Sequence, residues 1–142
     1  MKNKFFNYLT LIIVIGSFAL VTTTYFYSGL QLNVYALIGL ILMVPSLILF
    51  SLARIQLGSS FNVKAVASKL VTEGIYKKIR HPIYLFAQIF LLGFIILLQN
   101  FYLLIPWVLI IFMQKIRSIK EDKVLEEKFG DEYRQYKKNT WF

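Results

Sequence analysis

Two long stretches of this chain contain no Asp, Glu, Lys, Arg or His. The first extends from Phe5 to Ala53 and the second from Pro82 to Gln114. Uncharged apolar runs longer than about 18 residues are typical of transmembrane helices, whereas a signal peptide has an apolar core of about 7–15 residues. The pattern therefore predicts an integral membrane protein.

A polar turn divides each stretch into two. Gly29 lies in the first turn, at 28–33, and the pair Gln99-Asn100 forms the second. We expect about four transmembrane helices, at about 5–27, 34–54, 82–98 and 101–117. The last two form a C-terminal helical hairpin, so the polar segments at its two ends lie at the same membrane surface. The prediction is an all-α fold in a single domain, 1–142.

The polar segments flank this hairpin. A connector, 55–81, precedes it, and a C-terminal helical segment, 118–138, follows it. No helix-breaking residue occurs between Trp107 and Phe129, so the last transmembrane helix is expected to continue beyond the membrane. Gly130 is expected to end that helix, and Asp131 to cap a short one carrying Tyr133 and Tyr136.

The composition agrees with a membrane location and excludes several kinds of site. The chain has 142 residues, of which 58% are hydrophobic and 17% aromatic, and its mean hydropathy is +0.63, which is outside the range of ordinary soluble domains. The absence of cysteine excludes disulfides, thiolate nucleophiles and thiolate metal sites. With a single histidine, a multi-histidine site is also excluded, and we expect no metal.

The positive charges are confined to one side of the predicted topology. All 16 Lys and Arg residues lie in the first four residues, between Arg54 and Arg80, or between Lys115 and Lys138. The positive-inside rule then places both termini and the connector in the cytoplasm, in the cell inner or plasma membrane. The net charge of +9 is accounted for by topology and by contact with anionic lipid headgroups, so we expect no nucleic acid partner.

The first polar cluster is Arg80-His81-Pro82-Ile83-Tyr84, at the start of the third apolar segment. Pro82 suits the first turn of a helix, and the positive end of that helix favours anionic partners. A single histidine at a helix start is more often structural than catalytic, and a tyrosine at this depth is common in aromatic belts. This cluster alone leaves its role open.

The second cluster follows the fourth apolar segment. Arg117, Glu121, Leu125 and Phe129 are spaced four residues apart and therefore share one helix face. Since Leu125 and Phe129 mark that face as packed, we expect a charged pair on it to have a function. The alternative is an exposed ion pair worth about 0.2–0.5 kcal/mol.

Together the two clusters resemble the isoprenylcysteine carboxyl methyltransferase-like family of membrane methyltransferases, which is related to phospholipid methyltransferases. The resemblance extends from about Leu57 to Tyr136, with Gly93 between the clusters. It rests on the segments Leu70-Val71-Thr72-Glu73-Gly74-Ile75-Tyr76, Arg80-His81-Pro82-Ile83-Tyr84, Arg117, Glu121-Asp122, Leu125, Phe129-Gly130 and Tyr133.

The resemblance implies an S-adenosylmethionine-dependent methyltransferase with a cytoplasmic cofactor pocket and a lipophilic or lipidated acceptor that enters from the bilayer. The function it implies is most like that of a protein-S-isoprenylcysteine carboxyl O-methyltransferase. It gives Arg117 and Glu121 catalytic roles, Arg117 orienting an anionic acceptor. The residues it places around the cofactor are Tyr76, Arg80, His81, Tyr84, Glu121, Asp122 and Leu125.

The chemistry of these side chains is compatible with that cofactor. Aromatic faces such as those of Tyr76 and Tyr84 attract a sulfonium cation. The carboxylate of Glu121 suits an ammonium group or ribose hydroxyls, and Arg80 suits a carboxylate. A carboxylate acceptor needs no general base, whereas an amine acceptor must be deprotonated, with His81 or Glu121 as candidates.

Three positions depart from the family pattern. Ile75 replaces a proline, Phe86 replaces a small residue and could narrow the pocket, and Asp122 replaces the second glutamate of a pair. These departures leave the identity of the acceptor open, and the sequence does not indicate the oligomeric state. Two other functions also remain: a membrane NAD(P)H-dependent reductase of the sterol reductase type, and a non-catalytic membrane scaffold.

Overall fold

The computed structural model describes residues 33–58 and 70–141, together with Gly16, Ala19, Thr23, Tyr27 and Gly29. The predicted first helix, 5–27, and part of the connector, 59–69, lie outside the described ranges. The elements are α2 (Val34–Leu57), η2 (Gly74–Lys77), α3 (Pro82–Leu98), η3 (Phe101–Leu103), α4 (Leu104–Phe129) and α5 (Asp131–Asn139). Within the described ranges every element is helical, apart from an isolated bridge between Ile79 and Trp141, which confirms the all-α prediction for this part of the chain.

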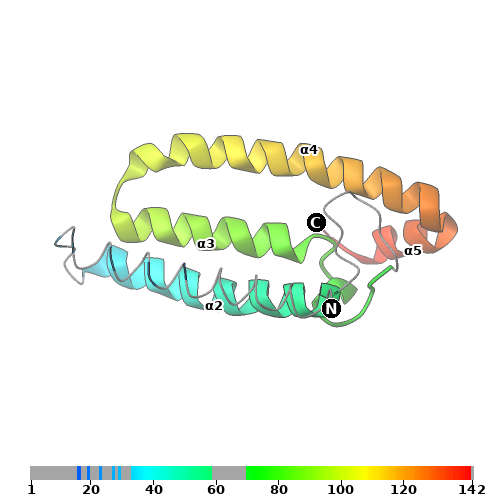
Figure 1. Ribbon diagram of the computed structural model, residues 1–142, viewed down its shortest axis with the longest axis horizontal. Helices are drawn as coiled ribbons and strands as arrows, with labels where there is room; N and C mark the ends of the chain where they lie inside the picture. Colours follow the sequence, from blue (N-terminus) through cyan, green and yellow to red (C-terminus); the bar gives the residue numbers. More distant parts are fainter. Residues whose placement is uncertain are drawn as a thin grey trace.

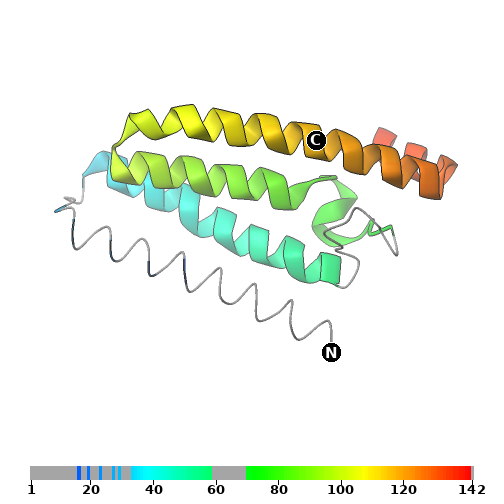
Figure 2. The same ribbon diagram turned by 45° about the horizontal axis from the view of Figure 1, so that its top comes forward.

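The three long helices lie side by side, with α3 between α2 and α4 (Figures 1 and 2). The end of α2, the start of α3, the end of α4 and all of α5 gather at one end of the bundle (Figure 1). This arrangement brings the two polar segments of the sequence together, as expected for a hairpin whose ends return to the same side.

The packing of α2 against α3 depends on two glycines. A Cβ atom on Gly39 would lie 2.7 Å from the carbonyl oxygen of Gly93, and one on Gly93 would lie 2.8 Å from that of Gly39. Small residues at such positions let helix backbones approach closely, as is common between membrane helices. Ala36, Met43 and Leu97 form the buried core beside this contact.

Local signals explain most helix ends. The side chain of Asn33 accepts a hydrogen bond from the Ala36 amide at 3.0 Å and so caps α2. Pro82 begins α3, and Gln99 ends it in a left-handed conformation with φ of 53°. α2 continues to Leu57, three residues beyond the expected 54, whereas α3 has the expected range.

The predicted domain layout has one C-terminal helix at 118–138, but the structure divides this segment between two helices. Residues up to Phe129 continue α4, and Gly130, with φ of 53°, turns the chain into α5. The break at Gly130 was expected, but Asp131 is the first residue of α5 rather than its cap. Glycine adopts this conformation without the steric cost that a Cβ atom would impose.

Two described helical segments are long and apolar enough to cross a membrane, Val34–Leu57 and Phe101–Phe129, and α3 is a shorter apolar helix of 17 residues. The apolar part of α4 exposes large hydrophobic side chains such as Ile105, Phe112 and Met113. Such a surface is suited to contact with lipid. The expectation of four spans remains a prediction, since most of the first lies outside the described residues.

Candidate functional site

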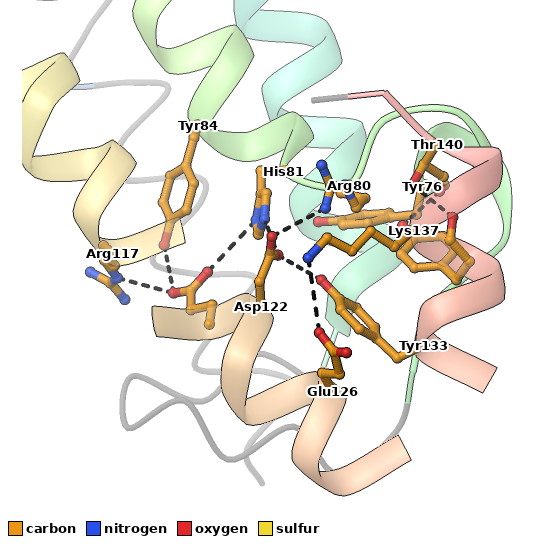
Figure 3. A network of polar contacts seen from close by, with 12 residues as sticks. Tyr76, Arg80, His81, Tyr84, Arg117, Asp122, Glu126, Tyr133, Lys137 and Thr140 are labelled. Carbon is orange, nitrogen blue, oxygen red and sulfur yellow. Dashed lines mark hydrogen bonds and ion pairs between the residues drawn. The ribbon is translucent and has the colours of Figure 1, made fainter. Parts of the chain in front are cut away.

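The candidate site lies where the start of α3 meets the polar half of α4 and α5 (Figure 3). Pro82 starts α3 and thereby fixes the direction of Arg80, His81 and Tyr84, while α4 supplies two consecutive carboxylates, Glu121 and Asp122. The structure thus brings together residues that lie about 40 positions apart in the sequence.

Glu121 is bound by one residue from each side of the hairpin. The Tyr84 hydroxyl donates a hydrogen bond of 2.6 Å to Oε1 of Glu121, and Nε of Arg117 donates to the same oxygen at 3.1 Å. The Arg117 guanidinium also lies over the Tyr84 ring, 5.9 Å from its centroid. The second oxygen, Oε2, is 3.8 Å from Nδ1 of His81, so it keeps most of its capacity to accept hydrogen bonds.

Asp122 accepts three hydrogen bonds, two from the adjacent residues before α3 and one from α5. Its Oδ1 accepts from Nε2 of His81 at 2.8 Å and from the Tyr133 hydroxyl at 2.6 Å, and its Oδ2 accepts from Arg80 at 3.1 Å. Since a carboxylate only accepts, the proton lies on Nε2 of His81. Burial raises the pKa of the Asp122 carboxyl, but the hydrogen bonds from His81 and Tyr133 outweigh burial and lower this pKa to about 2.

The segment after Gly130 closes over this cluster. Tyr133 is fully buried, the Tyr136 hydroxyl donates to the carbonyl oxygen of Tyr76 at 2.8 Å, and the Trp141 amide donates to that of Lys78 at 3.0 Å. Burial raises the pKa of Tyr136 to about 12, and burial followed by the bond to Asp122 raises that of Tyr133. Both hydroxyls therefore stay protonated and remain donors.

Tyr133 and Tyr136 were not among the predicted site residues. The signal available in the sequence was a pair of tyrosines three residues apart on a short helix after a glycine, at positions that share one helix face. That spacing indicates packing of the short helix, but it does not identify Asp122 as the partner.

Two predicted site residues lie at the edge of the cluster. Tyr76 is 5% exposed, and its hydroxyl donates to the carbonyl oxygen of Ala53 at 3.2 Å, which ties η2 to α2. Leu125, one turn beyond Glu121, is half-buried. The predicted packed stripe is less buried than expected, since no residue of α4 is buried and the Arg117 side chain is 48% exposed.

Phe86 is buried at 8% exposure. It precedes Gly93 by seven residues and therefore shares the face of α3 that packs on α2. This position directs its bulk away from Tyr84, which lies about two and a half turns before Gly93 on the opposite face. Among the described residues, no three His, Cys, Asp or Glu side chains are arranged to hold a metal ion.

The Glu121 carboxylate, the Arg117 guanidinium and the Tyr84 ring are all in contact with one another. Glu121 is 24% exposed and Arg117 about half exposed, so both can reach a bound molecule. Asp122 is 15% exposed and accepts three hydrogen bonds from protein donors. The two consecutive carboxylates therefore differ: one can receive a ligand, and the other holds the surrounding segments in place.

Comparison with known proteins identifies a family for most of the described region. Residues 33–132 match the model of a family described as phospholipid methyltransferase. A protein-S-isoprenylcysteine O-methyltransferase from Schizosaccharomyces pombe is 40% identical in an alignment 99 residues long, and the match covers 63% of this chain and 41% of that protein.

A solved structure is also similar. It is that of a eukaryotic intramembrane Ras methyltransferase, an isoprenylcysteine carboxyl methyltransferase, with a TM-score of 0.69 and 28% identity. The similarity covers 92% of this chain and 50% of the solved chain. The chain thus spans half or less of the length of these two relatives.

Proposed function

Because this chain belongs to the phospholipid methyltransferase family and is of the isoprenylcysteine carboxyl methyltransferase-like kind, we propose that it is a membrane methyltransferase. It takes the methyl group from S-adenosylmethionine and transfers it to a lipophilic acceptor at the cytoplasmic membrane face. The function closest to this proposal is that of a protein-S-isoprenylcysteine carboxyl O-methyltransferase.

The observation that carries the proposal is the arrangement of Tyr84, Arg117 and Glu121. Tyr84 comes from the first family segment, and Arg117 and Glu121 come from the second, yet all three meet at Oε1 of Glu121. A simple exposed ion pair between Arg117 and Glu121 would not require a tyrosine from another helix. The contact instead fixes both charged side chains at the end of the apolar hairpin, where a lipid-dissolved molecule and a water-soluble cofactor can meet.

The donor and acceptor groups at this end fit S-adenosylmethionine. Glu121 has an oxygen available for an ammonium group or a ribose hydroxyl. Nε of Arg80 is buried with no hydrogen-bond partner in the part of the chain that the structure describes, and it lies beside the N-terminus of α3, which favours a carboxylate. When bound, the cofactor supplies a methyl group on a sulfonium centre.

The chain's own contribution is positioning. Holding two reactants in line lowers a barrier by about 7–11 kcal/mol at best. Arg117, half exposed at the membrane end of the site, orients an anionic acceptor through charge-assisted hydrogen bonds. His81 and Tyr84 stack with their ring centroids 5.7 Å apart and form one wall of the site, and Asp122 fixes His81.

The position of Arg117 favours a carboxylate acceptor. Its guanidinium is about half exposed and can pair with an anion, and a carboxylate attacks without loss of a proton. An amine acceptor would need a base, and the one ring nitrogen of His81 not bound to Asp122 faces Glu121. We therefore assign O-methylation of a lipophilic acid as the preferred reaction.

The test is methyl transfer from tritiated S-adenosylmethionine by the detergent-solubilised protein. One acceptor is N-acetyl-S-farnesylcysteine, which carries a prenyl thioether and a free carboxylate, and the other is a phospholipid with a primary amine headgroup. Label in a base-labile ester of the first compound, lost in Arg117→Ala, supports the proposal. Label only in the amine lipid, or in neither, contradicts the proposed carboxylate acceptor.

A further inference from the structure

A buried amide lies on the site-facing side of α3, within the apolar part of the hairpin. Both polar atoms of the Gln88 side chain, Oε1 and Nε2, are buried and have no hydrogen-bond partner among the described residues. An unpaired buried amide is costly, and polar groups at membrane depth are usually functional. Neither the family resemblance nor the proposed function gives Gln88 a role.

The position of Gln88 relates it to the site. Gly93 marks the side of α3 that packs on α2, and Tyr84 lies on the opposite side. Gln88 follows Tyr84 by four residues and therefore lies on the same face, about 6 Å further along the helix axis. It is thus one helical turn deeper in the apolar hairpin than the contact between Tyr84 and Glu121.

Helix α4 presents polar groups on its matching face. Gln114 is half-buried and precedes Arg117 by three residues, which places it about one turn back along the antiparallel helix. Trp107, seven residues before Gln114, has a buried indole N–H without a partner among the described residues. The facing sides of α3 and α4 therefore carry the hydrogen-bonding groups of Gln88, Gln114 and Trp107, at a depth where membrane helices usually pack with apolar side chains.

We propose that Gln88 is a specificity-determining residue. It binds an uncharged oxygen of the acceptor, one helical turn deeper in the apolar hairpin than the acceptor's reacting group. The inference rests on the proposed function, in which the reacting carboxylate lies at Arg117. The preferred acceptor is then a lipophilic acid with a hydroxyl or carbonyl oxygen close to its carboxylate. A tail without such an oxygen gains no hydrogen bond from the Gln88 amide and therefore binds less tightly than an acceptor that has one.

The experiment compares two acids that differ only in this oxygen, 3-hydroxyhexadecanoate and hexadecanoate. Each displaces radiolabelled hexadecanoate from the detergent-solubilised protein, without added cofactor. The wild type should bind the hydroxy acid about tenfold more tightly, the gain of one hydrogen bond. Gln88→Leu should bind both acids with affinities within about twofold of each other, and Gln135→Leu, at an exposed position of α5, should behave as the wild type.

A second measurement tests whether the amide is unpaired in the free protein. Leucine removes the polar atoms at similar size, so Gln88→Leu should melt at the same temperature as the wild type or higher. A lower melting temperature would show that the amide already has a partner and would overturn the inference. Equal binding of both acids by the wild type, a preference that persists in Gln88→Leu, or no binding of either acid would also overturn it.

Failure of the inference is distinguishable from failure of the proposed function. Binding of S-adenosylmethionine should be the same in Gln88→Leu and in the wild type, because Gln88 lies a helical turn away from Glu121 and Tyr84. If the wild type binds the cofactor but does not distinguish the two acids, only the role of Gln88 is wrong. If the wild type does not bind the cofactor, the proposed function itself is wrong.

Discussion

Tyr84 and Glu121 are 37 positions apart in the sequence and are joined by a hydrogen bond of 2.6 Å between the tyrosine hydroxyl and Oε1 of the carboxylate. This bond closes the open end of the hairpin formed by α3 and α4. The backbones of these two helices make far fewer contacts with each other than those of α2 and α3 do. The polar cluster therefore has a large part in holding α4 in place at this end.

Removal of the Tyr84 hydroxyl should weaken catalysis. A hydrogen bond to a charged group is worth about 1.5–3 kcal/mol, so Tyr84→Phe should lower kcat/KM for methyl transfer by at least about tenfold. The control is Tyr102→Phe, since Tyr102 is 85% exposed at the other end of the hairpin. Equal activity of Tyr84→Phe and the wild type would show that the Tyr84 hydroxyl has no part in the reaction.

The contact between Gly39 and Gly93 should not tolerate a methyl group. A Cβ on Gly39 would meet backbone and side-chain atoms of Gly93 and Leu97 at 2.7–2.9 Å, and overpacking of this kind costs about 1–3 kcal/mol. We expect a lower melting temperature for Gly39→Ala in detergent. Gly16→Ala is the matched control, because a Cβ there meets nothing within 4 Å. The same loss in both variants would contradict the close packing of α2 on α3.

The bond from Tyr133 to Asp122 should stabilise the closed position of α5. Tyr133→Phe keeps the buried ring and removes a donor to a carboxylate, which should cost about 1.5–3 kcal/mol of stability. Arg134→Ala tests a neighbour whose side chain is 61% exposed, so that solvent screens its ion pairs. Thermal unfolding should therefore respond much more to the first change than to the second.

Asp122 should make the protein sensitive to acid. Its pKa is lowered from 3.8 to about 2 in the folded state, so the unfolded state binds more protons between these values. The stability contributed by this group is complete above about pH 4 and is lost as the pH falls towards about 2. The melting temperature of the wild type should fall more steeply across this window than that of Asp122→Asn. Parallel curves would mean that Asp122 is not paired as described.

The sequence was sufficient to predict the structural features that depend on the distribution of charge and on residues that begin or end helices. The range of α3 follows from Pro82 and from the polar turn at Gln99-Asn100. The meeting of the two polar clusters follows from the hairpin, because both of its helices return to the same side. The family was also recognisable, since the two clusters occur in the right order around an apolar hairpin.

The hydrogen-bond partners of the site residues could not be predicted from the sequence. Glu121 and Asp122 are consecutive in the sequence. Their positions did not show that Asp122 accepts hydrogen bonds from Arg80, His81 and Tyr133. That pairing depends on the direction in which α5 leaves Gly130, and no short-range pattern determines it. The expected burial of the stripe through Arg117 was also too great, because α4 packs weakly on α3 and presents its other sides outward.

The central claim is that this site binds S-adenosylmethionine through Glu121. The most direct measurement is calorimetric titration of S-adenosylmethionine into the detergent-solubilised wild type, Glu121→Gln and Glu127→Gln, the last an exposed glutamate on the same helix. We predict saturable binding by the wild type and by Glu127→Gln, and binding weakened by at least about tenfold in Glu121→Gln, the loss of one charge-assisted hydrogen bond. No binding by a folded wild type, or equal binding by all three proteins, would contradict the claim.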